Sequence, residues 1–216
     1  MQWLDFFKAK KLLEKYGINF AESVLVKNKG ELKNVKIEFP WAMKVYGKIL
    51  HKTEAGGVKV DIGNLEEAED AFLKMKNIPG SEGVIVQRMY KGIELIIGCK
   101  EDAQFGKIIL FGLGGIMTEI FKDVSIRALP ISRYDAKKMI REIKGFKILN
   151  GFRNLKPVNL KLLEEYLLRV SHLMQKENIS EMDINPIIAY DNKLIAVDVR
   201  IKICLLYTSP SPRDRG

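Results

Sequence analysis

Apolar residues recur at intervals of three and four positions in several stretches of the chain, a pattern typical of helices with one buried face. Asn64 with Glu67 three positions later resembles a capping box, and Asn159 is a candidate N-cap for a long helix. Gly17 supplies a stop signal after the first stretch. The pattern predicts helices over about residues 4–16, 65–75, 133–144 and 159–177.

Runs of β-branched and aromatic residues lie between these helices and predict strands. The predicted strands lie near residues 24–26, 40–45, 58–62, 83–90, 93–99, 107–111, 124–129, 182–190 and 193–201. Residues 28–35 are polar and fit a loop or a very short helix. We expect a hairpin at Lys91-Gly92 and a turn at Asp191-Asn192. Strands and helices in mixed order, with several hairpins, favour an α+β fold over a doubly wound parallel sheet.

The composition is that of a water-soluble globular protein: 47% of the 216 residues are hydrophobic and 29% are charged. This length fits one unit with two lobes. No apolar run approaches the roughly 20 residues of a membrane span, and the opening residues do not resemble a signal peptide. We therefore expect a cytoplasmic protein that does not interact with membranes. With only Cys99 and Cys204, a disulfide framework or thiolate metal site is excluded.

The formal net charge is +9, which favours anionic partners. The lysines are scattered over helical faces and form no basic stripe with interleaved aromatic residues, so we expect no nucleic-acid surface. A nucleotide, coenzyme A or an acidic partner subunit would account for the charge. Residues 204–216 break from the preceding pattern and resemble translated vector sequence; we expect a non-native or disordered tail.

A lysine and two glycines flank the first stretch with candidate chemistry. Lys44 lies in a predicted strand, and Gly56-Gly57 precedes the next one. Such a lysine can hold nucleotide phosphates, while backbone N–H groups at the glycines can approach them closely. An edge lysine and a hairpin bulge are the plainer alternative. The segment does not have the spacing of a P-loop.

Between these residues lies His51, one of two histidines, with Lys52 and Thr53 beside it. An imidazole that is largely neutral at pH 7 can attack phosphorus as a nucleophile. A surface histidine in a loop is the alternative. The other histidine, His172, lies among apolar residues of a predicted helix, and we interpret it as structural.

Hard oxygen ligands are found on the last two predicted strands. If these strands pair through the turn at 191–192, Asn185 and Asp198 lie near each other, and Asp183 shares a face with Asn185. Magnesium prefers such ligands and fills its octahedron with waters and nucleotide phosphates. Exposed polar residues beside a turn are the alternative, although Asp198 follows an apolar run where an unpaired carboxylate is costly.

The segment Gly112-Leu113-Gly114-Gly115 lacks the third glycine of a dinucleotide fingerprint. It fits a phosphate-contacting turn or a plain chain reversal. Arg127 on the following strand could reach an anion, and an ion pair with Asp123 or Glu119 is the alternative.

These motifs resemble one family, the β subunit of ADP-forming (NDP-forming) acyl-CoA synthetases such as acetate-CoA ligase, which is related to the succinyl-CoA synthetase β subunit. The resemblance runs from about Lys8 to Ile203. Its most specific segments are Ile49 to Val58, Gln104-Phe105-Gly106, Phe111 to Ile116 and Asp183 to Pro186. It implies an ATP-grasp domain over residues 1–203, with an N-terminal lobe of about 1–86 and a C-terminal lobe of about 87–203.

The resemblance also implies roles for individual residues. Adenine would be held by the connecting strand around Val86 to Tyr90, which includes Met89, with Gln87 and Glu94 on the adenosine side. Lys44 would contact phosphates of ATP or ADP, and Asn185 and Asp198 would bind Mg²⁺. His51 would receive a phosphoryl group and pass it to ADP.

The implied reaction converts acyl-CoA, ADP and phosphate into free acid, coenzyme A and ATP, reversibly. Coenzyme A would bind to a separate α subunit, in an expected α2β2 assembly. The segment 27–39 is shorter than is usual in the family, and Arg88 stands where an acidic residue is common. Two alternatives remain: a carboxylate-amine ligase, which would not need His51, and a nucleotide-sensing module of an acetyltransferase-type protein.

Overall fold

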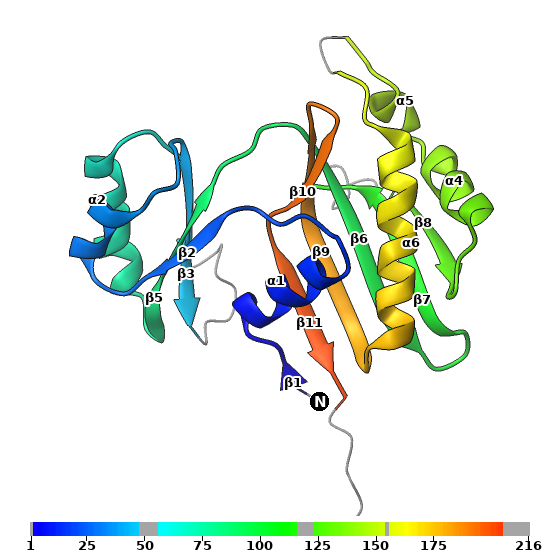
Figure 1. The fold of residues 1–216 in the computed structure, drawn as a ribbon, viewed down its shortest axis with the longest axis horizontal. Coiled ribbons are helices and arrows are strands. Elements are labelled where there is room, and N and C mark those ends of the chain that lie inside the picture. The colour runs from blue at the N-terminus through cyan, green and yellow to red at the C-terminus, as the bar shows by residue number, and fades with distance from the viewer. Residues whose placement is uncertain (1, 48–55, 116–122, 154–155, 205–216) are drawn as a thin grey trace, which may run out of the picture. The chain divides into compact units, whose positions relative to one another are not determined.

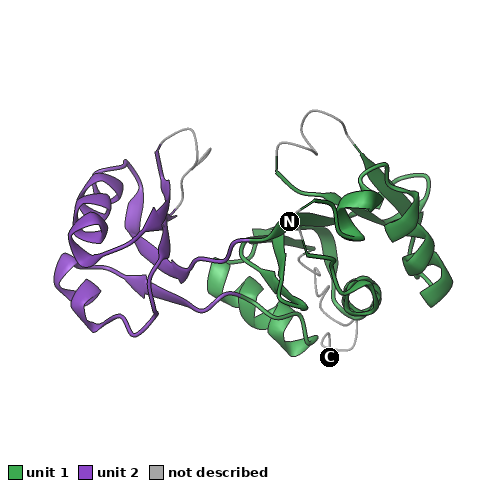
Figure 2. Cartoon of the chain, turned by 90° about the horizontal axis from the view of Figure 1, so that it is seen from above, with its two compact units in different colours: residues 1–20, 92–216 green, residues 21–91 purple. Residues whose placement is uncertain are grey.

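The structure is a computed structural model that describes residues 2–47, 56–115, 123–153 and 156–204. The chain divides into two compact units, which Figure 2 colours separately. Residues 21–91 form the smaller unit, and residues 1–20 together with 92–216 form the larger unit.

The smaller unit is a four-stranded antiparallel sheet with a helix packed against it (Figure 1). The strand order is β2-β5-β3-β4. The strands are β2 (Ser23–Val26), β3 (Trp41–Gly47), β4 (Val58–Ile62) and β5 (Ser81–Arg88). The helices are the 3-10 helix η1 (Lys29–Asn34) and α2 (Leu65–Lys76).

Helix α2 begins at the predicted cap. The Asn64 side chain accepts a hydrogen bond of 2.9 Å from the backbone N–H of Glu67, and it donates one of 3.0 Å to the Glu67 carboxylate. The first of these bonds satisfies a backbone donor that the first helical turn leaves unpaired. The apolar side of the helix, including Phe72 and Met75, is buried against the sheet.

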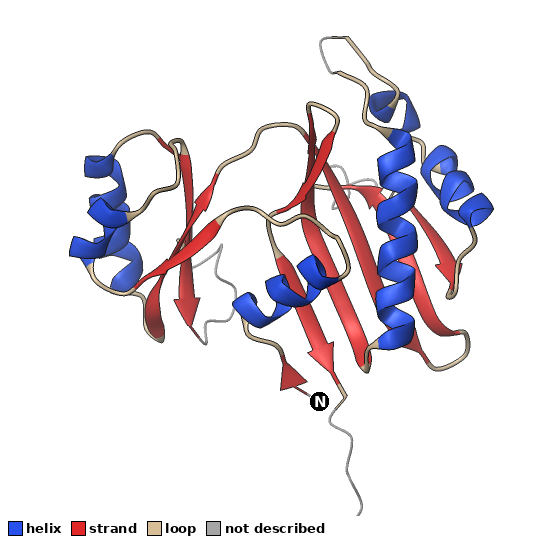
Figure 3. Cartoon of the chain, in the orientation of Figure 1, coloured by secondary structure: helices blue, strands red, loops and turns tan. Residues whose placement is uncertain are grey.

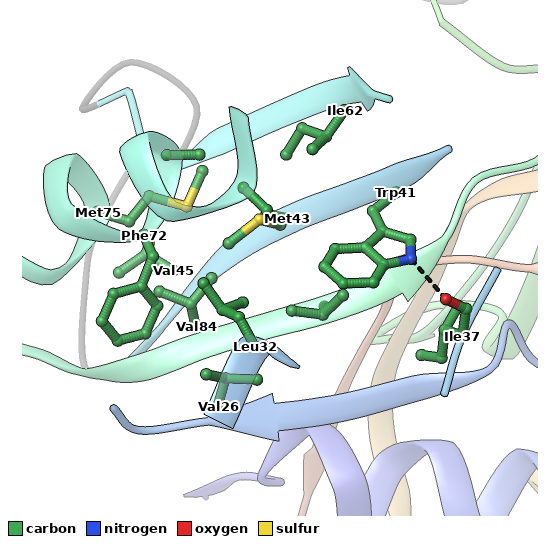
Figure 4. Close-up of a cluster of buried hydrophobic side chains, with 13 residues drawn as sticks. Val26, Leu32, Ile37, Trp41, Met43, Val45, Ile62, Phe72, Met75 and Val84 are labelled. Atoms are coloured by element: carbon green, nitrogen blue, oxygen red, sulfur yellow. Dashed lines mark hydrogen bonds between the residues drawn. The ribbon is translucent and has the colours of Figure 1, made fainter. Parts of the chain in front are cut away.

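Alternate residues of β3 supply the core of the smaller unit (Figure 4). Met43 and Val45 are fully buried in it, and Trp41 donates from its indole nitrogen to the carbonyl oxygen of Ile37 over 2.8 Å. Because side chains alternate along a strand, Lys44 lies on the other face of this sheet. The core therefore fixes the direction of the predicted phosphate-binding lysine.

The larger unit contains a seven-stranded antiparallel sheet with order β1-β11-β9-β6-β7-β8, and β10 also pairs with β9. Its strands are β1 (Gln2–Trp3), β6 (Ile93–Asp102), β7 (Gly106–Leu113), β8 (Val124–Ala128), β9 (Ile179–Tyr190), β10 (Lys193–Ala196) and β11 (Val199–Ile203). Its helices are α1 (Phe6–Lys15), α4 (Arg133–Glu142), α5 (Phe146–Leu149) and α6 (Leu160–Lys176).

Helices α1, α4 and α6 lie over one face of this sheet (Figure 3). Side chains that point to the helices, such as Ile97 and Ile184, are fully buried. We call the other side of the sheet the opposite face. Its residues on the three central strands are Glu94, Ile96, Gly98 and Lys100 on β6, Glu181, Asp183 and Asn185 on β9, and Arg200 and Lys202 on β11.

The helix predictions are confirmed, including the caps at Asn64 and Asn159. The Asn159 side chain accepts a hydrogen bond of 3.1 Å from the backbone N–H of Leu162. The short helix α5 was not predicted, because four residues are too few to show a periodic pattern. None of the helices in the described ranges has the length and apolar character needed to cross a bilayer.

Two strand predictions are wrong. The hairpin at Lys91-Gly92 does not form, because β5 pairs with β2 and β3 while β6 pairs with β7 and β9 in the other sheet. Strand β5 is buried over its central residues and has a neighbour on both sides, so β6 is not needed beside it. The strand predicted over 193–201 is two strands, interrupted at Val197 and Asp198.

The first 20 residues, which we expected in the N-terminal lobe, group with the larger unit. Strand β1 pairs with β11, and the backbone N–H of Leu4 donates to the carbonyl oxygen of Ile201 over 2.8 Å. The backbone N–H of Asn19 donates to the hydroxyl of Tyr166 on α6 over 2.9 Å. These contacts explain why the unit contains both ends of the described chain.

Candidate functional site

Asn185 and Asp198, the two predicted magnesium ligands, lie directly opposite each other. The backbone N–H of Asn185 donates to the carbonyl oxygen of Asp198 over 3.3 Å, and that of Val197 donates to Pro186 over 3.1 Å. Residues opposite each other in an antiparallel pair project to the same side. The predicted pairing is therefore confirmed, while metal binding stays a prediction.

The turn that creates this pairing is the one predicted at Asp191-Asn192. Both residues have positive φ, 40° and 62°, as a tight hairpin turn of the primed type requires. Beyond it, β10 pairs with β9 from Lys193 to Ala196, and β11 resumes the pairing at Val199. Asp198 lies at the break, where its carboxylate accepts a hydrogen bond of 2.9 Å from the backbone N–H of Val199.

Asp183 adds a second carboxylate to the same face. It is two positions from Asn185 on β9, and its neighbours across the sheet are Gly98 and Arg200. Burial raises the pKa of its carboxyl group, and the positive charge of Arg200 partly opposes this rise. Among the described residues no group of three or more His, Cys, Asp or Glu side chains could hold a metal ion. The donors at the predicted site are instead one carboxylate and one amide oxygen, hard ligands that suit Mg²⁺ when a nucleotide completes the shell.

Glu94 and the glycines of the Gly112–Gly115 segment lie together. The backbone N–H of Gly114 donates to the carbonyl oxygen of Glu94 over 2.6 Å. A Cβ atom at Gly114 would lie 3.0 Å from the Glu94 Cβ, and one at Gly115 would lie 2.5 Å from the Glu94 carboxylate. Gly115 also has a φ of 62°, which favours glycine. The structure thus brings together three predicted nucleotide-binding residues, Glu94 on β6 and two glycines that directly follow β7.

Arg127 faces the helices and not the opposite face. Its guanidinium forms an ion pair of 2.6 Å with Glu142 on α4, and the Ser125 hydroxyl donates to the same carboxylate. The pair raises the pKa of Arg127 and lowers that of Glu142. The ion-pair alternative for Arg127 therefore fits, with Glu142 as the partner. Asp123, one of the two expected partners, instead accepts hydrogen bonds from the backbone N–H groups of Lys144 and Gly145 at 2.8 and 2.6 Å, and Glu119 lies outside the described residues.

In the smaller unit, Lys44 and Gln87 share the face away from α2. Lys44 pairs with Ile85, and Ala42 pairs with Gln87, so the two polar residues are diagonal neighbours. Gln87 is 1% exposed and donates from its amide to the Ser23 hydroxyl over 3.1 Å. A buried amide held in one orientation can discriminate between ligand donors and acceptors.

The loop that carries the candidate nucleophile is described only at its end. His51, Lys52 and Thr53 lie outside the described residues. The carbonyl oxygen of Gly57 accepts a hydrogen bond of 2.7 Å from the backbone N–H of Val45. Gly56 has a φ of 68°, and a Cβ there would meet nothing within 4 Å. Gly56 is therefore needed for its backbone conformation, whereas no close approach to it is observed.

Met89 and Tyr90 follow the end of β5. The backbone N–H of Met89 donates to the carbonyl oxygen of Pro40 over 3.0 Å, and its sulfur accepts from the backbone N–H of Asp61 over 3.1 Å. Arg88, the departure from the family pattern, pairs with Glu38 at 3.1 Å and lies 5.9 Å from the Tyr90 ring centroid. Both partners of this ion pair are exposed, so it contributes little to stability.

Arg200 was missed by the sequence interpretation. It is exposed, two positions beyond Asp198, and lies on the same side of the sheet as Asp183. The alternation of polar and apolar residues from Asp198 to Lys202 could have pointed to it.

The comparisons with known proteins fit this geometry. A model described as an ATP-grasp domain matches residues 1–203. The chain is 45% identical to the β subunit of acetate-CoA ligase [ADP-forming] I of Pyrococcus furiosus, over 90% of this chain and 89% of that one. It is 40% identical to acetate-CoA ligase [ADP-forming] II of Archaeoglobus fulgidus, over 96% of this chain but only 32% of the relative.

A solved structure is similar over nearly the whole chain. Acetyl-coenzyme A synthetase 1 of Ca. Korarchaeum cryptofilum, in complex with coenzyme A and Ca-AMPCP, has a TM-score of 0.87 and 38% identity, covering 94% of both chains. The same enzyme with Mg-AMPPCP has a TM-score of 0.81, and its phosphohistidine segment points towards the nucleotide-binding site.

Proposed function

Since the chain belongs to the ATP-grasp domain family, we propose that it is the nucleotide-binding subunit of an ADP-forming acyl-CoA synthetase. The observation that carries the proposal is the pairing of Asn185 with Asp198 across β9 and the segment before β11. The names of the relatives support the reaction class. They do not favour a carboxylate-amine ligase or a nucleotide-sensing module.

The proposed chemical step transfers a phosphoryl group between His51 and ADP. The bond from the imidazole nitrogen to phosphorus breaks, and a bond forms from phosphorus to a terminal oxygen of ADP. The nitrogen keeps the bonding pair and takes up one proton, which gives ATP and neutral histidine. The phosphohistidine segment of the Korarchaeum enzyme supports this role for His51.

Other residues of this chain would bind and orient the nucleotide. Asn185 and Asp198 would hold Mg²⁺, which supplies charge neutralisation at the phosphates when it is bound. Lys44 would contact the phosphates as a point charge. The adenosine contacts would come from Gln87, Met89, Tyr90 and Glu94, and the backbone of Gly114-Gly115 and Gly56-Gly57 would approach the phosphates.

The complete reaction needs a second set of binding residues. Coenzyme A and the acyl group would bind to an α subunit, for which the name of the Pyrococcus relative as a β subunit is the support. An α2β2 assembly is part of this proposal. The chain spans about a third of the length of the Archaeoglobus relative, 32%.

The direct test is phosphorylation of the chain by ATP labelled on its γ-phosphate, with Mg²⁺. The expected product is a base-stable, acid-labile phosphohistidine that His51→Ala abolishes. His172→Ala is the matched control, because His172 is the other of the two histidines and its ring centroid lies 5.9 Å from that of Tyr16, which follows α1. Undiminished labelling of His51→Ala would exclude the histidine carrier.

A further inference from the structure

Two rows of residues run side by side across the larger sheet. In one row Asn185 is opposite Asp198, and in the next row Asp183 is opposite Arg200. The rows are two residues apart on each strand, which is about 7 Å in an extended chain. All four residues lie in an antiparallel pairing whose opposed members project to the same side. Arg200 is therefore a cation within side-chain reach of the predicted magnesium site.

Arg200 differs from neighbouring cations in its partners. Lys202, the next residue on the same face, forms an ion pair of 3.6 Å with Glu181 and lies 5.4 Å from the centroid of the Trp3 ring. Within the described ranges the Arg200 guanidinium forms no hydrogen bond and no ion pair of 4.0 Å or less. The N–H donors of the Arg200 guanidinium can therefore bind a ligand on the exposed side of β11.

The residue beside this row is a glycine. The third member of the row is Gly98, which pairs with Asp183 from the other side. A Cβ at Gly98 would meet its nearest neighbour, a Leu110 carbon, at 3.9 Å, and its φ is not in the left-handed region. Neither backbone strain nor close packing explains the glycine. Its effect is that no side chain from β6 lies directly beside Asp183.

We propose that Arg200 binds the phosphoryl group that is transferred, while Asn185 and Asp198 hold the magnesium-bound diphosphate. The inference rests on the proposed function. A planar guanidinium with paired N–H donors matches phosphate oxygens in a bidentate manner, which a lysine cannot reproduce. In the transition state the transferred phosphoryl group carries charge on its equatorial oxygens. Preorganised hydrogen-bond donors that point at these oxygens lower the activation barrier.

The plainer explanation is that Arg200 only offsets the charge of Asp183. The two explanations differ in what the loss of the guanidinium does. If Arg200 only balances Asp183, its removal changes the stability of the sheet and leaves nucleotide selectivity unchanged. If it holds the terminal phosphoryl group, its removal weakens the binding of a triphosphate more than that of a diphosphate.

The test compares equilibrium binding of ADP and of the non-hydrolysable analogue AMPPCP, both with Mg²⁺, to the whole chain. In Arg200→Gln we expect the affinity for AMPPCP relative to ADP to fall by about tenfold or more, as loss of a charge-assisted hydrogen bond implies. Lys202→Gln is the matched control and should keep the wild-type ratio. Arg200→Lys should recover part of the loss, because it restores the charge but not the fork.

Two other results for Arg200→Gln would overturn the inference. An unchanged affinity ratio in Arg200→Gln would show that the guanidinium does not touch the terminal phosphoryl group. An equal loss for both nucleotides with a lower urea midpoint would favour the purely structural role. Failure of the proposed function can be distinguished from failure of this inference. In that case the wild-type chain itself does not bind the two nucleotides, or it is not labelled at His51.

Discussion

The backbone N–H of Asn185 bonds to the carbonyl oxygen of Asp198 at the point where β10 ends and before β11 begins. This hydrogen bond keeps the register across an interruption of the ladder. Without it, a one-residue slip would turn one of the two side chains to the helix-covered face. The predicted metal site thus depends on backbone pairing as much as on the two side chains.

Replacing either ligand should remove magnesium-dependent nucleotide binding. In Asn185→Ala or Asp198→Asn, the thermal shift caused by ADP with Mg²⁺ should vanish. For a ligand at 100 times its Kd the wild-type stabilisation would be about 2.7 kcal/mol. Glu181→Gln, on the same strand and also exposed, should retain the full shift. A retained shift in both ligand variants would place the metal elsewhere.

The glycine beside Glu94 gives a second prediction. Gly115→Ala should destabilise the protein more than Gly56→Ala, because both positions have positive φ but only Gly115 faces a side chain at the Cβ position. The backbone cost common to both is about 1–2 kcal/mol. Urea denaturation measures the difference.

Removal of the Glu94 side chain separates the backbone cost at residue 115 from the cost of the contact with Glu94. In a Glu94→Ala background the cost of Gly115→Ala should fall to that of Gly56→Ala. If the two glycine variants cost the same in the wild-type background, the contact with Glu94 does not restrict residue 115.

The cap of α2 gives a third prediction. Asn64→Ala removes the acceptor for the Glu67 N–H and should lower the free energy of unfolding by about 1 kcal/mol. Asp70→Ala, on the exposed side of the same helix, should change it by less than about 0.5 kcal/mol. Equal effects of the two substitutions would mean that the cap is not formed in solution.

The Glu142 carboxylate gives a prediction about acid stability. Its hydrogen bond with Arg127 lowers its folded-state pKa, so the group stabilises the protein above its unfolded pKa of about 4.3 and loses this effect as pH falls through the lower folded value. Glu142→Gln should therefore be less stable than the wild type at pH 7. The difference in stability between the two proteins should be smaller at pH 3. Urea midpoints at both pH values measure this. An equal difference at both would contradict the pKa shift.

The sequence was most informative where a residue determines the backbone conformation of its near neighbours in the chain. Asn64, Asn159 and the turn at Asp191-Asn192 each select a conformation within a few residues, and the structure contains all three. The pairing of Asn185 with Asp198 follows from that turn by counting residues outward. Local chemistry thus predicted most helices and the backbone of the candidate site.

The sequence was least informative where a partner lies far along the chain. Arg127 could have paired with Asp123 by proximity, but the alternation along β8 turns it to Glu142 on α4. Lys91-Gly92 looked like a hairpin because two β-rich runs flank it, yet each run has its partners in a different sheet. Such choices depend on which surfaces compete for burial across the whole molecule, and no short pattern contains that information.

The pairing of Gln2 with Ile203 has a consequence for synthesis of the chain. Strand β1 cannot pair until residues 202 and 203 of β11 have left the ribosome, roughly 200 residues after β1 itself. Residues 21–91, whose contacts are with one another, are free to fold long before that. Contacts of such long sequence separation form slowly, so we expect the edge formed by β1 and β11 to be among the last parts of the larger sheet to close.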